Sequence, residues 1–323
     1  MNKIKNKKTF IGLTIILTLI LLVIIVISIN MGSAKLNLYT KGSDPFVYNA
    51  IIYNIRLPRI LLAGIVGMGL SVCGAIYQCI LKNKMADPYI LGVSSGAALG
   101  ATIAIITKSF ISIKLLAFLT AILITVLVYI ISKKGMKKNS TSLILTGINI
   151  NYFLTAIISL LMILNKDQMD KIIFWTMGSF ASSTWINVIW SAIIVIPSTI
   201  IVSFFGKQLN AINLDEKTAK SVGVDVELIR KIMIAICCLI TAMCVSSSGI
   251  IGFIGLMIPH FVRLVLGGDY RYLITLSGIT GAIFLIASDL IARTIITPTE
   301  IPIGIITAII GAPYLIYLIA RKR

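Results

Sequence analysis

Long apolar segments separated by short polar ones constrain the fold of this chain more than any other feature. A helix needs roughly 20 apolar residues to cross the hydrocarbon core of a bilayer. Segments of about this length cover residues 10–31, 60–81, 89–107, 115–132, 143–164, 186–205, 232–249, 250–267, 272–292 and 303–320. The sequence therefore predicts an all-α, polytopic membrane protein with about ten transmembrane helices.

The overall composition indicates the same class. Of the 323 residues, 58% are hydrophobic and 12% are charged, whereas soluble domains are about 45–50% apolar and about 25% charged. The net charge of +18 could suggest a nucleic-acid partner. However, the basic residues form short runs between apolar segments and are not interleaved with aromatic residues. We therefore expect a lipid bilayer around the chain and no nucleic acid bound to it.

The basic runs also predict the orientation of the chain. Lysine and arginine resist translocation and stay on the cytoplasmic side. With ten spans and an internal amino terminus, most of the 29 cations fall on that side: the loop 207–231 and Lys3, Lys5, Lys7, Lys8, Lys82, Lys84, Lys133, Lys134, Lys137, Lys138, Arg263, Arg271, Arg321, Lys322 and Arg323. Nine spans would place the basic tail outside, so both termini are predicted to be cytoplasmic.

One cytoplasmic loop is far longer than the others. It covers residues 207–231 and contains a mixed-charge stretch from Asp215 to Gly223. A glycine after a short amphipathic stretch is typical of a helix–turn–helix. Membrane proteins seldom keep such a loop unless something contacts it, although a solvated loop is the alternative. We expect residues 1–323 to form a single transmembrane domain whose loop 207–231 contacts a partner.

The start of the third segment carries two overlapping patterns. Three glycines lie on one helix face, which lets membrane helices pack closely: Gly92, Gly96 and Gly100. The same stretch matches Gly-x-Ser-x-Gly, so an intramembrane serine protease using Ser94 or Ser95 with His260 is one alternative. The nucleophile elbow of such enzymes needs a preceding strand, and none is predicted here. Helix packing is therefore the favoured interpretation.

Ionisable residues inside the apolar segments are few. His260 is the single histidine, which cannot build a metal site alone, and we expect it to hydrogen-bond near a kink at Pro259. Asp289 and Arg293 have the i, i+4 spacing of a helical ion pair. An ion-coupled secondary carrier, the second alternative, would need a chain of ionisable groups near the midplane. The sequence does not offer one.

The chain also lacks a motif for its own energy source. No Gly-x-x-x-x-Gly-Lys-Ser/Thr phosphate loop is present, so any ATP must be hydrolysed by another polypeptide. The five cysteines lie in apolar segments without a Cys-x-x-Cys pair, and no metal site follows from them. We expect a transport subunit that is not an enzyme and holds no cofactor.

Several motifs, taken in chain order, resemble one family. They are Arg56-Leu57-Pro58-Arg59, Ala86-Asp87-Pro88, Leu91-Gly92-Val93-Ser94-Ser95-Gly96-Ala97-Ala98-Leu99-Gly100, Gly252-Phe253-Ile254-Gly255-Leu256-Met257-Ile258-Pro259-His260, Asp289-Leu290-Ile291-Ala292-Arg293 and Glu300-Ile301-Pro302-Ile303-Gly304. Over essentially its whole length the chain resembles the permease subunits of iron–siderophore, haem and vitamin B12 ABC importers, which are FecCD-type or type II importers.

This resemblance implies a ten-helix permease in the bacterial cytoplasmic membrane that imports a metal chelate. It also implies the partners: a second copy or a paralogue, two cytoplasmic ATPases that bind the ATP, and an extracellular substrate-binding protein. The loop 207–231 corresponds to the coupling loop of the family, in which Glu216, Ala219 and Gly223 resemble a Glu-Ala-Ala…Gly pattern. One departure is Lys84, because the family usually has proline after Asn83.

Two turns on the predicted cytoplasmic side suggest a gate. One lies between the second and third spans and the other enters the fifth. They carry small or neutral polar groups that would let a chelate pass without trapping it, because conduction requires weak binding. The predicted gate residues are Asn83, Met85, Ser140 and Thr141.

Three arginines map to the extracellular ends of helices, against the positive-inside bias: Arg56, Arg59 and Arg293. Arginine binds carboxylates bidentately and stays charged at physiological pH. We therefore predict that these residues receive acidic residues of the binding protein. The alternative is that they anchor the helix ends by snorkelling or by contact with lipid phosphate.

Overall fold

The computed structural model describes residues 7–32, 49–109, 111–134, 140–296 and 299–321. Six cations of the predicted cytoplasmic runs lie outside these residues: Lys3, Lys5, Lys137, Lys138, Lys322 and Arg323. Within the described ranges the secondary structure is helical, without a strand. The all-α prediction is therefore confirmed.

Seven helices are long and apolar enough to cross a membrane, and three shorter apolar helices accompany them in the described part of the chain. The long ones are α1 (Lys7–Asn30), α3 (Leu57–Ile80), α5 (Ile113–Lys134), α6 (Ser140–Leu164), α8 (Trp185–Phe204), α11 (Val226–Ser248) and α13 (Tyr270–Thr294). The shorter ones are α4 (Val93–Thr107), α12 (Ile254–Leu266) and α14 (Ile303–Arg321). Each matches one predicted segment, in order.

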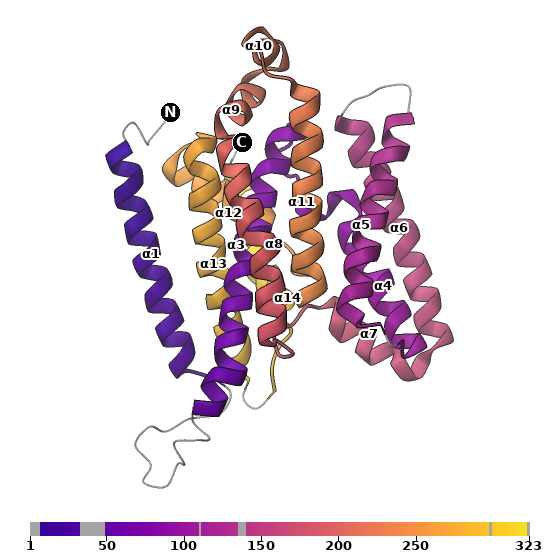
Figure 1. Cartoon of the computed structure of the whole chain (residues 1–323). Helices are drawn as coiled ribbons and strands as arrows, with labels where there is room; N and C mark the ends of the chain where they lie inside the picture. Colours follow the sequence, from indigo (N-terminus) through magenta and orange to yellow (C-terminus); the bar gives the residue numbers. More distant parts are fainter. Residues whose placement is uncertain (1–6, 33–48, 110, 135–139, 297–298, 322–323) are drawn as a thin grey trace.

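Short helices connect these elements, most of them at the two ends of the bundle, whereas the turn Pro88–Leu91 packs near Gly255 of α12, beside the middle of α3. They are a π-helical turn (Ile52–Arg56), two 3₁₀ turns (Pro88–Leu91 and Lys166–Gln168), α7 (Met169–Thr176), α9 (Gly206–Leu214) and α10 (Glu216–Ser221). Figure 1 shows that α10 projects from one end, where both termini also lie. We call this the α10 end, and the opposite one the arginine end.

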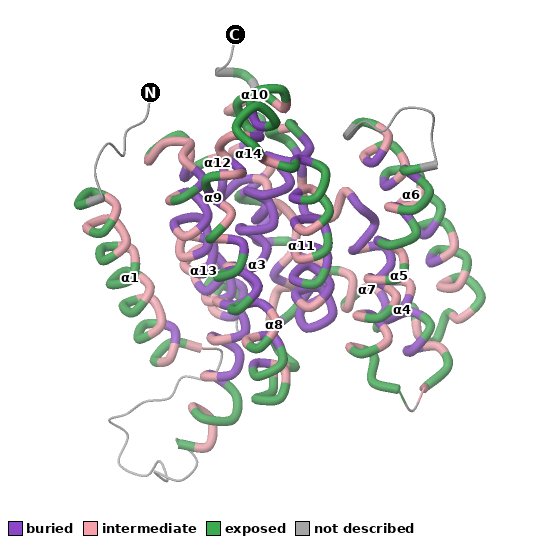
Figure 2. Tube along the Cα trace, turned by 45° about the horizontal axis from the view of Figure 1, so that its top comes forward, coloured by how far each residue is buried: buried purple, intermediate pink, exposed green. Residues whose placement is uncertain are grey.

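Helix α3 occupies the centre of the bundle, and Figure 2 shows burial concentrated on α3, α11 and α13. Glycines allow the close packing of α3. A Cβ added to Gly67 would lie 2.3 Å from the carbonyl oxygen of Gly281 in α13, and one on Gly74 would lie 1.7 Å from that of Gly255 in α12. No side chain fits at such distances, so small residues set the helix spacing here.

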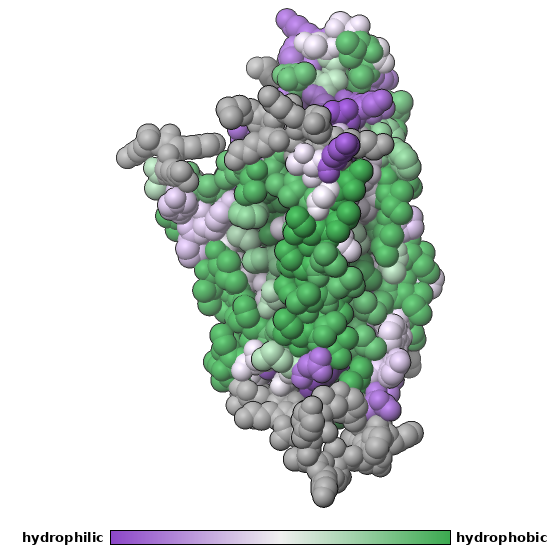
Figure 3. Space-filling model, turned by 90° about the vertical axis from the view of Figure 1, so that its left-hand side faces the viewer, coloured by the Kyte–Doolittle hydropathy of each residue, from purple (hydrophilic) through white to green (hydrophobic). Residues whose placement is uncertain are grey.

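Helix α1 lies at the rim of the bundle and exposes most of its apolar side chains. Figure 3, which looks onto this side, shows a broad apolar band between polar ends. In a soluble protein a patch of this extent would be an aggregation hazard. The band is the surface that a multi-pass membrane protein presents to lipid.

Aspartate side chains cap four helical segments by accepting a backbone N–H of the first turn. Asp87 caps the 3₁₀ turn that starts at Pro88, and α4 then begins only after Gly92, which has φ +82°. The other capping residues are Asp215, Asp225 and Asp269, for α10, α11 and α13. Because Asp225 fixes the start of α11, this helix begins six residues before the predicted apolar segment.

Candidate functional sites at the two ends of the bundle

A buried cluster of charges lies at the arginine end. The guanidinium of Arg59, in the first turn of α3, donates to Asp289 of α13 through Nε (3.0 and 3.1 Å) and Nη2 (2.9 Å). Its Nη1 donates to Glu300, in the loop before α14, at 2.8 and 2.9 Å. Arg59 and Asp289 are only 7% and 1% exposed. One cation therefore joins three parts of the chain through charge-assisted hydrogen bonds.

The other two arginines hold the end of α1. Arg293 Nη2 donates to the carbonyl oxygen of Ser28 at 2.6 Å and to the hydroxyl of the same residue. Arg56 Nη1 donates to the carbonyl oxygens of Ile29 and Asn30 at 2.6 and 3.1 Å. These carbonyls lie in the last turn of α1, where helices leave acceptors unsatisfied and favour cations. Both arginines are buried.

Sequence reasoning anticipated part of this cluster. The expected pair is present, with Arg293 Nε 3.7 Å from Asp289 Oδ2. The stronger partner of Asp289 is Arg59, which the sequence analysis missed because the two residues are 230 positions apart. All three arginines engage groups of their own chain, so their predicted role in docking a binding protein stays a prediction. Any such role must draw on guanidinium groups that already have partners.

At the α10 end the charges are more exposed. Glu216, at the start of α10, pairs with Arg230 of α11 at 2.7 Å and lies 3.8 Å from Lys82, just after α3. Ala219 is fully buried within the chain itself. Gly223 has φ +82° and open space where a Cβ would be, so its backbone rather than its size requires glycine within this chain. The three predicted coupling residues thus lie in one short helical unit.

Helix α9 is fastened to the bundle by Asn210. Its Nδ2 donates to Asp269 Oδ1 at 2.7 Å, and its Oδ1 accepts the backbone N–H of Tyr270 at 2.9 Å. Burial disfavours ionisation of Asp269, but hydrogen bonds from Arg271 and Asn210 outweigh it and hold the pKa of this carboxyl below its ordinary value. The α9–α10 unit is therefore tied to the start of α13.

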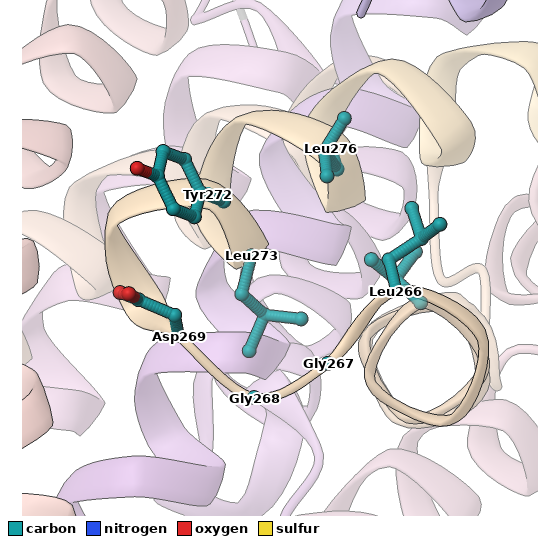
Figure 4. A pocket seen from close by; sticks show the side chains of 8 residues that line it. Leu266, Gly267, Gly268, Asp269, Tyr272, Leu273 and Leu276 are labelled. Atoms are coloured by element: carbon teal, nitrogen blue, oxygen red, sulfur yellow. The ribbon is translucent and has the colours of Figure 1, made fainter. Parts of the chain in front are cut away.

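A small cavity lies beside this junction, between the end of α12 and the start of α13. Figure 4 shows its lining, with Gly267 and Gly268 in the turn and leucines of both helices around it. Its volume of about 10 Å³ is the space of roughly one water molecule. This cavity is too small for a ligand.

The predicted gate residues lie on two segments at the α10 end (Figure 1). Asn83 Oδ1 accepts the backbone N–H of Met85 at 2.9 Å, which shapes the turn after α3. The side chains of Met85 and Thr141 are exposed. Ser140 begins α6, and its side chain is outside the described residues. Their action as a gate stays a prediction.

The glycines of α4 lie against α5. A Cβ on Gly96 would come within 2.9 Å of Ile124, and one on Gly100 within 2.1 Å of the Thr120 hydroxyl. Gly92 differs from its expected helical position, because it is the left-handed residue that precedes α4. These contacts leave no room for larger side chains on this face of α4.

The geometry required by the alternative serine protease is not found among the described residues. The hydroxyl of Ser95 donates to Asn151 of α6 at 2.6 Å, and Ser95 follows a 3₁₀ turn rather than a strand. His260 lies on α12, directly after Pro259. No group of three or more potential metal ligands occurs in the described part of the chain. The geometry therefore offers neither a nucleophile elbow nor a metal centre.

A bundle of about ten apolar helices, with a short helical unit projecting from one end, defines the class of multi-pass membrane proteins. A profile of the FecCD transport family matches residues 13–321, and the chain belongs to this family of ABC transporter permeases. Such permeases are not themselves catalytic, so the class agrees with the absence of a nucleotide-binding motif in the sequence.

Relatives match along most of their length. The cobalamin import system permease BtuC of Halobacterium salinarum is 39% identical over 86% of this chain and 76% of its own. The hemin transport system permease HmuU of Yersinia pestis is 34% identical over 92% and 91%. A solved structure described as an inward-facing metal-chelate type ABC transporter has a TM-score of 0.85 and 34% identity, and the match covers 98% of this chain and 100% of that one. The fold is that of type II importer permeases.

Proposed function

We propose that this chain is the transmembrane subunit of an ATP-driven importer that moves a metal chelate, such as a ferric siderophore, haem or cobalamin, into the cytoplasm. The observation that carries the proposal is the nearly full-length similarity to permeases named for cobalamin and hemin import. A separate polypeptide hydrolyses the ATP, and an extracellular binding protein delivers the substrate. The α10 end faces the cytoplasm, which agrees with its basic residues.

In this proposal the α9–α10 unit is the contact for the ATPase. The proposal is supported by the contacts of the unit, because each one joins it to a different membrane helix. Glu216 binds Arg230 in α11 and approaches Lys82 at the end of α3, and Asn210 binds Asp269 at the start of α13. A displacement of the unit by the ATPase would therefore act on three helices of the bundle.

The substrate pathway would lie between two permeases rather than inside one. An open, mostly apolar hollow of about 430 Å³ is lined by Thr176 and Met177 at the end of α7, Phe253 before α12, and Gly304 and Ile309 of α14. Apolar side chains on this face are exposed, as expected for a surface that a second copy or a paralogue covers. The inner mouth would be bounded by Asn83, Met85, Ser140 and Thr141.

Cross-linking tests the gate. Cysteines placed at Asn83 or Ser140 should form disulfides between two protomers and block uptake, and reduction should restore it. If the disulfides form and uptake continues unchanged, the constriction lies elsewhere.

Docking of the binding protein would use Arg56, Arg59 and Arg293 by exchange of partners. Glu300 is the most exposed member of the cluster, with 29% of its side chain accessible, whereas Asp289 is buried. A carboxylate from outside can therefore replace Glu300 on Arg59 more easily than it can replace Asp289. Contacts at this rim would steer association and weaken with salt.

This geometry also decides which substitution tests docking. Replacing Arg59 by glutamate would place a third carboxylate beside Asp289 and Glu300, so loss of uptake would report misfolding. Replacing Glu300 by glutamine instead removes the negative charge from one side of Arg59 and leaves the buried pair with Asp289 intact. We expect E300Q to bind the binding protein faster at low salt, and the gain should vanish at high salt. An unchanged association rate at both salt concentrations would remove Arg59 from docking.

Reconstitution tests the function itself. The permease, its ATPase and its binding protein should accumulate a ferric siderophore, haem or cobalamin in proteoliposomes only with ATP. Binding assays on the binding protein select the substrate to use. Accumulation driven by a proton or sodium gradient without the ATPase would overturn the proposal in favour of a secondary carrier.

A further inference from the structure

A groove between α5 and α11 is not used by the transport mechanism described above. It offers a space of about 470 Å³, within the range of small-molecule sites. Its walls come from two faces at helical spacing: Ile122, Thr125, Val126, Tyr129 and Lys133 of α5, and Lys231, Ile234, Ala235, Cys238 and Leu239 of α11. Apart from the two lysines and the hydroxyl groups of Thr125 and Tyr129, the walls are apolar.

The packing of the two helices explains why the groove opens at only one end. Toward the arginine end, Ala117 and Ala121 of α5 belong to the same buried cluster as Ala242 and Val245 of α11. Small residues let the helices meet there. In both helices the residues that line the groove lie between this cluster and the α10 end.

The groove has the length of one membrane leaflet. Eleven residues separate Ile122 from Lys133, and at 1.5 Å per residue the groove extends about 16 Å along α5. Half of a hydrocarbon core of about 30 Å is about 15 Å. An acyl chain that starts at the headgroup level would therefore end where the alanines close the groove.

The charges of the groove lie where a headgroup would be. Lys133 is in the last turn of α5 and Lys231 in the second turn of α11, both toward the α10 end (Figure 1). Lys133 Nζ lies 4.9 Å from the centroid of the Tyr129 ring. Within the described residues neither ammonium belongs to an ion pair. Two cations at the mouth of an apolar groove between membrane helices match an anionic lipid.

We propose that this groove binds a phospholipid with an anionic headgroup, such as phosphatidylglycerol. Its phosphate lies between Lys133 and Lys231, and one acyl chain lies along Tyr129, Ala235 and Cys238. The chain has 11 acidic residues against 29 basic ones, so a helix of a second copy would offer few carboxylates to the two lysines, which disfavours a protein occupant. The site is independent of the transported substrate.

Native mass spectrometry of the full chain tests the site, with phosphatidylglycerol and phosphatidylcholine of identical acyl chains in equal amounts. The wild type should retain phosphatidylglycerol preferentially. The double variant K133Q/K231Q should lose about five-fold of this preference per lysine, or about 25-fold in total. A control that removes two lysines of the same end, K84Q/K207Q, should keep the preference.

A second variant separates the groove from surface charge. A235W fills the apolar part and keeps both lysines, so it should release both lipids, and an unchanged elution profile would show that the variant folds. Three results would overturn the proposal: an unchanged preference in K133Q/K231Q, an equal loss in the control, or displacement of the lipid by glycerophosphoglycerol, which has the headgroup but no chains. A change of oligomeric state in A235W would instead assign the groove to a second copy.

Discussion

Charged residues at the arginine end are buried and bound to one another, whereas those at the α10 end remain partly open to solvent. Arg59 lies between two carboxylates and only 8% of its side chain is exposed, but the side chain of Glu216, between two cations, is 39% exposed. Burial raises the cost of separating charges, and solvent lowers it. Breaking a charge contact should therefore cost more stability at the arginine end than at the α10 end, where the charges are more accessible to a partner.

The strongest test of this difference is Asp289→Ala. It leaves Arg59 and Arg293 buried with too little negative charge, and breaking a buried pair in this way costs about 3–5 kcal/mol. Unfolding by SDS in mixed micelles should show this loss. The control Asp167→Ala, on an exposed turn, should change stability by less than about 0.5 kcal/mol. A loss below about 1 kcal/mol for Asp289→Ala would show that the cluster does not stabilise the fold.

Glu300→Gln should have a smaller effect on the same measurement. Its carboxylate is partly exposed, and the neutral amide can still accept a hydrogen bond from Arg59. We expect a loss of about 1–2 kcal/mol. A loss as large as that of Asp289→Ala would mean that the ion pair of Glu300 with Arg59 stabilises the fold as much as the buried pair of Asp289 does. The exchange of partners proposed for docking would then be untenable.

At the α10 end, Gly223 separates a backbone effect from a contact with the ATPase. A side chain at positive φ costs about 1–2 kcal/mol, enough to change a local equilibrium about 5- to 30-fold. Gly223→Leu should insert normally into the membrane but uncouple ATP hydrolysis from uptake. If Gly223→Leu transports normally, this turn has no part in coupling.

Two substitutions by smaller side chains show whether backbone strain or bulk causes the loss of coupling. Alanine adds little bulk but resists positive φ, whereas asparagine is larger and tolerates it. If the backbone matters, Gly223→Ala will lose more coupling than Gly223→Asn. If size at an interface matters, the order will reverse.

The smallest change in stability is expected for Glu216→Gln. Exposed ion pairs contribute about 0–1 kcal/mol, so unfolding in SDS should shift by less than about 1 kcal/mol. Coupled ATPase activity should nevertheless fall, because the link from α10 to α3 and α11 is weakened. A stability loss above about 2 kcal/mol would show that the two ends do not differ as described.

The sequence predicts the helices of this protein well and its long-range charge contacts poorly. Apolar length marks each membrane helix, and i, i+4 spacing identifies Asp289 with Arg293, because both signals are local. The bond from Arg59 to Asp289 spans 230 residues, and that to Glu300 spans 241. The available signal was the placement of all four charges at the same predicted membrane face.

Small residues are a second case in which the sequence alone does not decide a role. The family resemblance implies that Ala219 contacts the ATPase, and the structure buries its side chain within this chain, so the contact stays a prediction. Small side chains serve internal packing and external contact equally well, so composition alone does not separate them. The sequence likewise does not give the φ of Gly223, because its positive value depends on the geometry of the turn.

The bond between Arg293 and the end of α1 has a consequence for the order of synthesis. Ser28 and Arg293 are 265 residues apart, so at about 5–20 residues per second a ribosome needs roughly 13–50 seconds to make the second after the first. During that interval the carbonyl oxygen of Ser28 lacks its hydrogen bond from Arg293, whereas Arg56 can already bind those of Ile29 and Asn30. Helix α1 is thus made long before the residue that secures its end, and the growing chain must tolerate a loosely held α1 until α13 has crossed.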